Sequence, residues 1–125
     1  LKRVGVTEII SLSACGSFKE ELDPGTFVII DQFIDRTFAR RKSFFGTGMV
    51  AHVGFCHPVC SRLGDSLEVG ARALGITTIR GGTYLAMEGP QFSTRAESLL
   101  YKSWGCDVDG MTNMPEAKLS REDEM

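Results

Sequence analysis

The stretch SLSACGS, residues 11–17, places small side chains and hydroxyl groups directly after an apolar run. Small side chains leave the backbone N–H groups of consecutive residues accessible, and such a group of donors can hold an anion. Ser13 would add a hydroxyl donor next to the N–H group of Ala14. The same residues also suit a tight exit from a buried strand, so the segment alone supports anion binding and simple packing equally.

A second candidate for anion binding lies in DGMTNMPE, residues 109–116. Thr112 and Asn113 follow a short expected strand and precede an expected helix, and the N-terminus of a helix suits an anion or a polar ligand. Asn113, with Glu116 three residues later, also fits an ordinary helix N-cap. The segment alone therefore favours a capped helix.

Phe92 and Ser93 occupy the seam between a strand and a helix in MEGPQFSTRAES, residues 87–98. The Gly89-Pro90 pair is expected to turn the chain after the strand. An aromatic face beside a neutral hydroxyl group suits a heterocyclic base. An equally compatible alternative places Phe92 in the core and Ser93 near the cap of the next helix.

Four side chains that could bind a metal lie within nine residues, namely His52, Cys56, His57 and Cys60. Their spacing matches none of the known zinc-finger or zinc-ribbon patterns, and Pro58 stiffens the backbone after His57. We therefore expect packed or loop residues here and no metal site, with zinc as the weaker alternative.

A basic and aromatic segment, DRTFARRKSFF, occupies residues 35–45. Basic residues interleaved with phenylalanines are compatible with nucleic-acid binding. The net charge of the chain is −2, so no wider basic field supports that interpretation. A solvated loop that packs its aromatic side chains underneath is favoured, and we expect no nucleic-acid partner. The glycines of GTGMVAHVG, residues 46–54, do not match a dinucleotide-binding fingerprint.

The elements that would position these residues alternate between strands and helices. Apolar runs predict strands at residues 9–12, at residues 27–30, on both sides of Gly81-Gly82, and in CDVDGMT. Helical spacing predicts helices that end at Gly75 and at Gly105, the second with a Thr94–Glu97 capping box, and a third from Asn113. The pattern predicts an α/β fold with a central β-sheet flanked by helices.

The chain has 125 residues, 42% of them hydrophobic, which is enough for one domain over residues 1–125. No apolar run approaches the roughly 18 residues of a membrane span, so we expect no membrane partner. Without a secretory signal pattern, the four cysteines are expected to be reduced and the protein cytoplasmic. Leu1 is not a start methionine and the last residues resemble a helix still under way, so we expect part of a longer protein.

Four motifs in this order carry a resemblance to a known family: SACGS, VIIDQFIDRT, GTYLAMEGPQFSTRAES and GMTNMPEAKL. Together they resemble the S-methyl-5'-thioadenosine phosphorylases of the purine nucleoside phosphorylase superfamily, over essentially all 125 residues. The resemblance implies a mixed central β-sheet in a nucleoside phosphorylase-like domain that is incomplete at both ends. It also implies a pentosyltransferase of purine and methionine salvage that needs no cofactor, with phosphate as a substrate.

The resemblance also implies roles for individual residues. Ser13, Ala14 and Thr112 correspond to phosphate contacts, and Met111 corresponds to the residue against the ribose. His52 corresponds to the histidine that reaches the 5'-methylthio pocket of a neighbouring subunit, because the family typically forms homotrimers with sites at subunit boundaries.

The two residues at the seam would form the base site. Phe92 corresponds to its aromatic wall, and Ser93 to the position that distinguishes adenine from 6-oxopurines. A glutamate there would accept a hydrogen bond from a purine N1–H, whereas adenine has no N1–H and is better served by a neutral hydroxyl group.

Some family features are absent from this sequence. An Arg-His phosphate pair would lie before Leu1 and the acid that binds the purine would lie beyond Met125, so no catalytic acid is assigned. Asp109 stands where relatives usually have an apolar residue. We expect these 125 residues alone to be inactive. The alternatives are a methylthioinosine or other 6-oxopurine phosphorylase, a truncated non-catalytic relative that only oligomerises and, as the weakest, a zinc-binding regulatory module.

Overall fold

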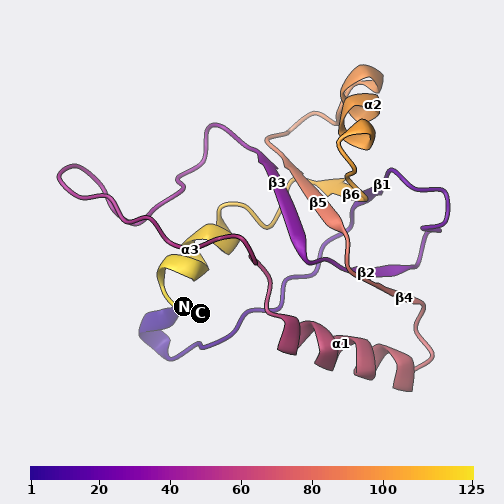
Figure 1. Cartoon of the computed structure of the whole chain (residues 1–125), viewed down its shortest axis with the longest axis horizontal. Helices are drawn as coiled ribbons and strands as arrows, with labels where there is room; N and C mark the ends of the chain where they lie inside the picture. Colours follow the sequence, from indigo (N-terminus) through magenta and orange to yellow (C-terminus); the bar gives the residue numbers. More distant parts are fainter.

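The structure, a computed structural model, describes residues 1–125 and combines six short strands with three α-helices (Figure 1). Many of the residues between these elements are irregular, above all residues 37–60. The elements in chain order are the 3₁₀-helix η1 (Lys2–Val4), β1 (Gly16–Ser17), β2 (Phe27–Ile29), β3 (Gln32–Arg36), α1 (Ser61–Ala73), β4 (Thr78–Arg80), β5 (Thr83–Met87), α2 (Arg95–Ser103), β6 (Val108–Gly110) and α3 (Glu116–Glu122).

The main sheet is mixed, as the family resemblance implied. Its strand order is β1-β6-β5-β3, in which β3, β5 and β6 are parallel and β1 is antiparallel to β6. Because β3, β5 and β6 run in the same direction, the segments that follow them leave from one edge of the sheet. Those segments begin at Thr37, Glu88 and Met111.

A second parallel pair, β2 with β4, continues the ladder of β3 with β5. Phe27 pairs with Thr78 and Gln32 pairs with Thr83, so both ladders keep the same register. The ladder bends where Gly81 and Gly82 adopt positive φ angles of 89° and 129°, which side chains other than glycine rarely allow. Across the bend, backbone bonds continue from Asp31 N–H to Gly82 O at 3.1 Å.

Helices α1 and α2 lie where local sequence signals predicted them. Helix α2 begins with the predicted capping box, in which Thr94 and Glu97 exchange hydrogen bonds between side chain and backbone. Gly75 and Gly105 follow α1 and α2 with φ angles of 68° and 81°, so each supplies a left-handed stop. Helix α1 packs beside β2 and β4.

The buried core has two small clusters on opposite faces of the sheet, because neighbouring residues of β5 point to opposite sides. One cluster contains Tyr84, Ala86, Val108 and Met114, with Ala117 of α3 packed against it. The other contains Leu85, Met87, Tyr101 of α2 and Cys106. Helices α2 and α3 therefore cover opposite faces (Figure 1).

Two expectations at the ends of elements are wrong. Residues 9–12 form no strand, and Leu12 is 78% exposed, because no strand lies beside this segment to complete a ladder. Asn113 is not the N-cap of α3: it has a φ of 69°, and the helix begins after Pro115 without a side-chain cap. The expected strand at residues 27–30 is confirmed as β2, but β3 directly after it was not predicted.

The two ends of the chain lie side by side (Figure 1), where Lys2 Nζ donates to Glu124 O at 3.3 Å. No helix combines the length and apolar character that crossing a membrane requires.

Candidate active site

Ser13 and Thr112 meet at the edge of the sheet, although 99 residues separate them in the sequence. The hydroxyl of Thr112 donates to Ser13 Oγ at 2.9 Å. The contact follows from the register of β1 with β6, because Gly16 pairs with Asp109 and the antiparallel alignment extends to Ser13 opposite Thr112. Ser13 and Thr112 therefore lie side by side, although Ser13 precedes a strand instead of following one.

The segment around Ser13 offers free donors. Ser13 and Ala14 are exposed, and the Ala14 N–H group has no acceptor in the protein. The backbone at residue 16 lies so close to Asp109 that only glycine fits there. A Cβ atom on Gly16 would overlap the carboxylate of Asp109. A hydroxyl and an N–H donor at one exposed position can bind an anion.

Asp109 lies directly behind this segment and is only 8% exposed. Burial raises the pKa of Asp109 above its ordinary value, and a hydrogen bond from its own backbone N–H opposes the shift only in part. Burial and the nearby Asp109 charge likewise raise the pKa of the Cys15 thiol. Asp109, which stands where relatives usually have an apolar residue, therefore places a titratable group beside the Ser13 segment.

Tyr84 of β5 contacts Thr112 from the buried side of the Ser13–Thr112 pair. Its side chain is 3% exposed, and its hydroxyl lies 3.0 Å from Thr112 Oγ1. The same oxygen accepts a hydrogen bond from the Thr112 N–H group at 3.3 Å. Gly110 makes room for this contact, because a Cβ atom there would overlap the Tyr84 hydroxyl. Tyr84 was not predicted as a site residue.

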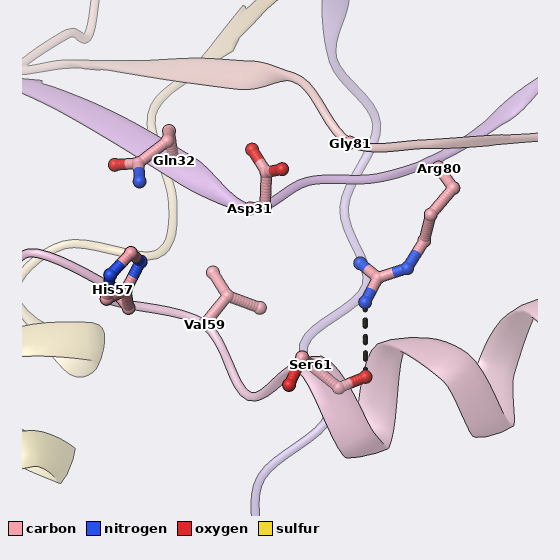
Figure 2. Close-up of a pocket in the computed structure, with 7 residues that line it drawn as sticks. All are labelled: Asp31, Gln32, His57, Val59, Ser61, Arg80 and Gly81. Carbon is pink, nitrogen blue, oxygen red and sulfur yellow. Dashed lines mark hydrogen bonds between the residues drawn. The ribbon is translucent and has the colours of Figure 1, made fainter.

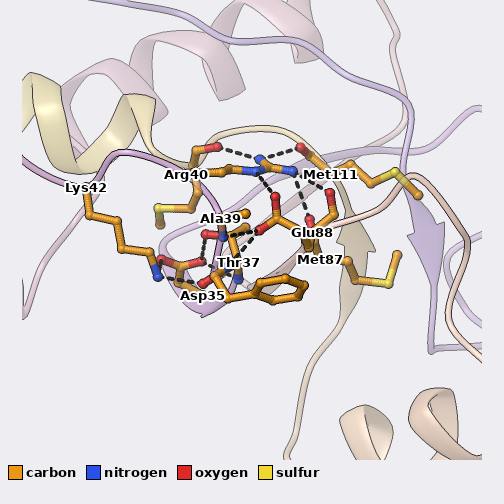
Figure 3. A network of polar contacts seen from close by, with 10 residues as sticks. Asp35, Thr37, Ala39, Arg40, Lys42, Met87, Glu88 and Met111 are labelled. Carbon is orange, nitrogen blue, oxygen red and sulfur yellow. Dashed lines mark hydrogen bonds and ion pairs between the residues drawn. The ribbon is translucent and has the colours of Figure 1, made fainter.

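Arg40 holds three segments of the sheet edge together (Figure 3). Its guanidinium group donates to the carbonyl oxygens of Met111 at 2.8 Å and Met114 at 2.5 Å. It also donates to the carbonyls of Met87 at 3.1 Å and Glu88 at 2.9 Å. The segment that carries Met111 and Thr112 is thereby fixed to the end of β5.

Glu88 completes this network by fixing the Arg40 loop. Its carboxylate accepts from the N–H groups of Phe38 at 2.6 Å and Ala39 at 3.2 Å, and it pairs with Arg40 Nε at 3.3 Å. The two backbone N–H donors, with Arg40 as a further cause, hold the pKa of Glu88 below its ordinary value. The expected packing of the loop is wrong: Phe38 is 81% exposed, whereas Arg40 points inward.

Asp35, near the end of β3, anchors α3 to the same edge through Lys118. Figure 3 shows its other contacts, with Thr37 and Lys42. Asp35 accepts from Lys118 of α3 and from the Thr37 hydroxyl at 2.6 Å, and Lys42 Nζ lies 3.3 Å away. Burial raises the pKa of Asp35, but the hydrogen bonds from Lys118 and Thr37 outweigh it and hold the pKa well below the ordinary value.

The residues expected at the base site follow β5. Phe92 is 87% exposed, and Ser93 Oγ forms a hydrogen bond with Ser98 Oγ at 2.8 Å. Met111 lies against the turn that leads to them, since a Cβ atom on Gly89 would come within 2.5 Å of its Sδ atom. Met111 therefore lies between Thr112 and the segment that carries Phe92. The alternative that placed Phe92 in the core is wrong.

His52 is exposed and joined to the Ser13–Thr112 pair by no hydrogen bond or ion pair. The structure brings together no group of three or more histidine, cysteine or acidic side chains that could hold a metal ion. Backbone carbonyls from this segment instead accept hydrogen bonds, that of Cys56 from Gln32 and that of His57 from Arg121.

A cavity of about 420 Å³ lies where β3 and β5 begin, at the ends of these strands that face away from the candidate site (Figure 2). Its walls are mainly polar and include Asp31, His57 and Arg80. The Arg80 guanidinium group is already paired, with Ser61 O at 3.1 Å and Asp65 at 3.2 Å. None of the expected site residues lines this cavity, so it is separate from the candidate site.

The chain is similar in sequence to curated proteins. The chain is 70% identical over 125 residues to S-methyl-5'-thioadenosine phosphorylase from Cereibacter sphaeroides, and all of the chain aligns with 43% of that relative. It is 69% identical to the protein of the same name from Rhodospirillum rubrum, over 42% of that relative. The chain thus spans less than half the length of these curated relatives.

Solved structures share the fold as well. A methylthioadenosine phosphorylase from Schistosoma mansoni superposes with a TM-score of 0.92 at 34% identity, over 98% of this chain and 50% of that one. The same enzyme in complex with tubercidin gives the same TM-score and identity. The nucleoside phosphorylase-like fold is confirmed by these superpositions. Because the family model described as "Phosphorylase superfamily" matches residues 1–125, the chain belongs to the phosphorylase superfamily.

Proposed function

We propose that this protein cleaves S-methyl-5'-thioadenosine with inorganic phosphate to give adenine and 5-methylthioribose 1-phosphate. The observation that carries the proposal is the exposed Ser13–Thr112 pair with the free N–H of Ala14 beside it. The names and identities of the relatives support the choice of nucleoside. No cofactor is required, because phosphate is itself the nucleophile.

The reaction exchanges one bond at the anomeric carbon. A phosphate oxygen forms a bond to C1' as the bond from C1' to the purine nitrogen breaks, and the proton of hydrogen phosphate is balanced by the proton gained by adenine. Ser13, Thr112 and the Ala14 N–H group hold the phosphate, and donors that keep it under the sugar lower the barrier by positioning. Met111 lies against the ribose.

The base lies on the exposed face of Phe92, with Ser93 beside it. A neutral hydroxyl group at this position avoids a carboxylate facing the N1 lone pair of adenine. The Ser93–Ser98 hydrogen bond supports the assignment, because it ties the Ser93 hydroxyl to α2 in the segment that carries the exposed Phe92. A group that protonates the leaving purine is not assigned to any residue of this chain.

The proposal extends to assembly and location. We place His52 at a boundary with a neighbouring subunit, in a homotrimer of a cytoplasmic protein. The support is its exposure next to exposed apolar residues such as Val50 and Val53, which are 74% and 41% exposed. Size-exclusion chromatography with light scattering of the full native chain measures the oligomeric state, and a monomer would contradict this part of the proposal.

The activity is tested on the full native chain with S-methyl-5'-thioadenosine, with and without phosphate. We expect adenine release that depends on phosphate and a sugar product that carries phosphate at C1'. Equal adenine release without phosphate would identify a hydrolase instead. Faster cleavage of methylthioinosine would favour the 6-oxopurine alternative, and no cleavage of any nucleoside would favour a non-catalytic relative.

A further inference from the structure

The Tyr84 hydroxyl begins a chain of three hydroxyl groups that ends at the surface. Tyr84, Thr112 and Ser13 follow one another at 3.0 Å and 2.9 Å. The first is almost fully buried and the last is exposed. The three come from different parts of the chain, namely β5, the segment after β6 and the segment before β1. Such a chain transmits the hydrogen-bond direction set at its buried end to its exposed end.

The buried end fixes that direction. Tyr84 accepts a hydrogen bond from the Thr112 N–H group, so its single proton is available for Thr112 Oγ1. Thr112 Oγ1 then accepts from Tyr84 and donates its own proton to Ser13 Oγ. Ser13 Oγ accepts from Thr112 and has no other partner in the protein, so its proton points away from the chain toward solvent.

We propose that Tyr84 is a positioning residue that orients the Thr112 and Ser13 hydroxyls so that Ser13 donates its proton to the bound phosphate. The identity of the anion rests on the proposed function above. The ionised oxygens of phosphate only accept hydrogen bonds, and hydrogen bonds to charged groups are stronger than those between neutral groups. A hydroxyl held as a donor matches that demand, whereas a freely rotating one would pay entropy to adopt the same direction.

The test compares Tyr84→Phe with Tyr101→Phe in the full native chain. Tyr101 is a matched control, because it is also buried, lies in the cluster on the other face of the sheet and has no hydrogen-bond partner for its hydroxyl. Each substitution removes one oxygen atom and leaves the ring. Circular dichroism and the melting temperature establish that both variants are folded before binding is measured.

We expect Tyr84→Phe to raise the KM for phosphate about 5- to 20-fold, because the Ser13 hydroxyl loses its fixed direction and its bond to the charged phosphate weakens without being lost. The KM for the nucleoside should change less than twofold, and Tyr101→Phe should change neither. A merely structural role would alter both KM values or only the melting temperature. Equal effects on the two KM values, or an unchanged KM for phosphate, would overturn the proposal.

A direct titration of the protein with inorganic phosphate separates this inference from the proposed function. If no nucleoside is cleaved, weaker phosphate binding by Tyr84→Phe than by the wild type still supports the hydroxyl chain, whereas equal binding or no binding overturns it. If Tyr84→Phe does not fold, the Ser13→Ala and Thr112→Val variants test the same chain. Losses of phosphate affinity that are less than additive support it, and additive losses overturn it.

Discussion

Single hydroxyl groups set the chemistry of the candidate site. Ser13, Thr112 and Ser93 are small and neutral, and the positions that surround them decide what they can bind. Ser13 gains its role from a contact with Thr112 at 2.9 Å. Ser93, which follows the exposed Phe92 in the sequence, forms a hydrogen bond with Ser98. Changing one polar atom of the protein therefore changes which ligand can satisfy every hydrogen-bonding group in the site.

Ser93→Glu in the full native chain should shift the preference from adenine nucleosides toward 6-oxopurine nucleosides. The new carboxylate would face a lone pair of adenine but would accept from the N1–H of hypoxanthine, a difference of about 1–3 kcal/mol. The measurement is the ratio of kcat/KM for methylthioadenosine and methylthioinosine. Ser98→Ala is the control, since it removes the partner of Ser93 without adding charge. An unchanged ratio in Ser93→Glu would contradict the role given to this position.

The sequence pointed to Ser13 and Thr112 as candidate site residues, but it did not point to the atoms that contact them. Ser13 and Thr112 stand out because small and hydroxyl residues follow apolar runs. Tyr84 gave no such signal, because an aromatic residue inside a strand normally indicates core packing. Its hydroxyl forms a hydrogen bond with Thr112, which is 28 positions away in the sequence. Only the parallel pairing of β5 with β6 brings the two residues together.

Among the elements, those defined by local interactions were predictable and those defined by distant contacts were not. The capping box of α2 needs only Thr94 and Glu97, so the sequence contains all of it. Residues 9–12 have the composition of a strand but no neighbouring strand to pair with. Arg40 was placed in a solvated loop because its acceptors are 47 to 74 residues away in the sequence.

Arg40→Lys should destabilise the protein by about 2–4 kcal/mol, because lysine cannot satisfy the four carbonyl groups that the guanidinium reaches. Hydrogen exchange should increase most at residues 111–114, next to the Ser13–Thr112 pair. Arg41→Lys is the control, because Arg41 bonds only to the carbonyls of Ser43 and Phe44 within its own exposed loop. Similar losses of stability in both variants would show that the contacts of Arg40 contribute no more than those of Arg41.

Asp35→Asn should weaken the attachment of α3 to β3 at neutral pH. Because the folded state lowers the pKa of Asp35, its contribution is complete above the ordinary aspartate pKa of about 3.9 and is lost as the pH falls below that value. Urea unfolding should give a loss of about 1–3 kcal/mol at pH 7 and a smaller difference at pH 3. Asp23→Asn, at a turn without an ion pair, is the control. An equal difference at both pH values would argue against the charged contact.

At the scale of the whole molecule, little of this chain is shielded from water. Only 12 of 125 residues are buried, and only Leu85 and Met114 have fully buried large side chains. Large apolar side chains such as Leu74, Val69 and Phe92 are more than two-thirds exposed. Exposed apolar surface of this extent typically marks contacts with other protein surface.

Residues 1–125 produced alone should therefore self-associate and bind the dye ANS, and should release no adenine above background. Light scattering, ANS fluorescence and an adenine-release assay test this beside the full native chain at equal concentration. Association should follow from the exposed apolar residues and the short edge strands. A monomer that unfolds cooperatively, excludes the dye and cleaves the nucleoside would refute the prediction.

The common register of the two parallel ladders limits where the sequence can gain or lose residues during evolution. Because β2 with β4 and β3 with β5 keep one register, the turn at residues 30–31 and the turn at residues 81–82 have matching lengths. A codon deleted from one turn alone would shift one ladder against the other and turn its side chains to the opposite face. Lineages that diverge from this sequence should therefore gain or lose residues in both segments together, or in neither.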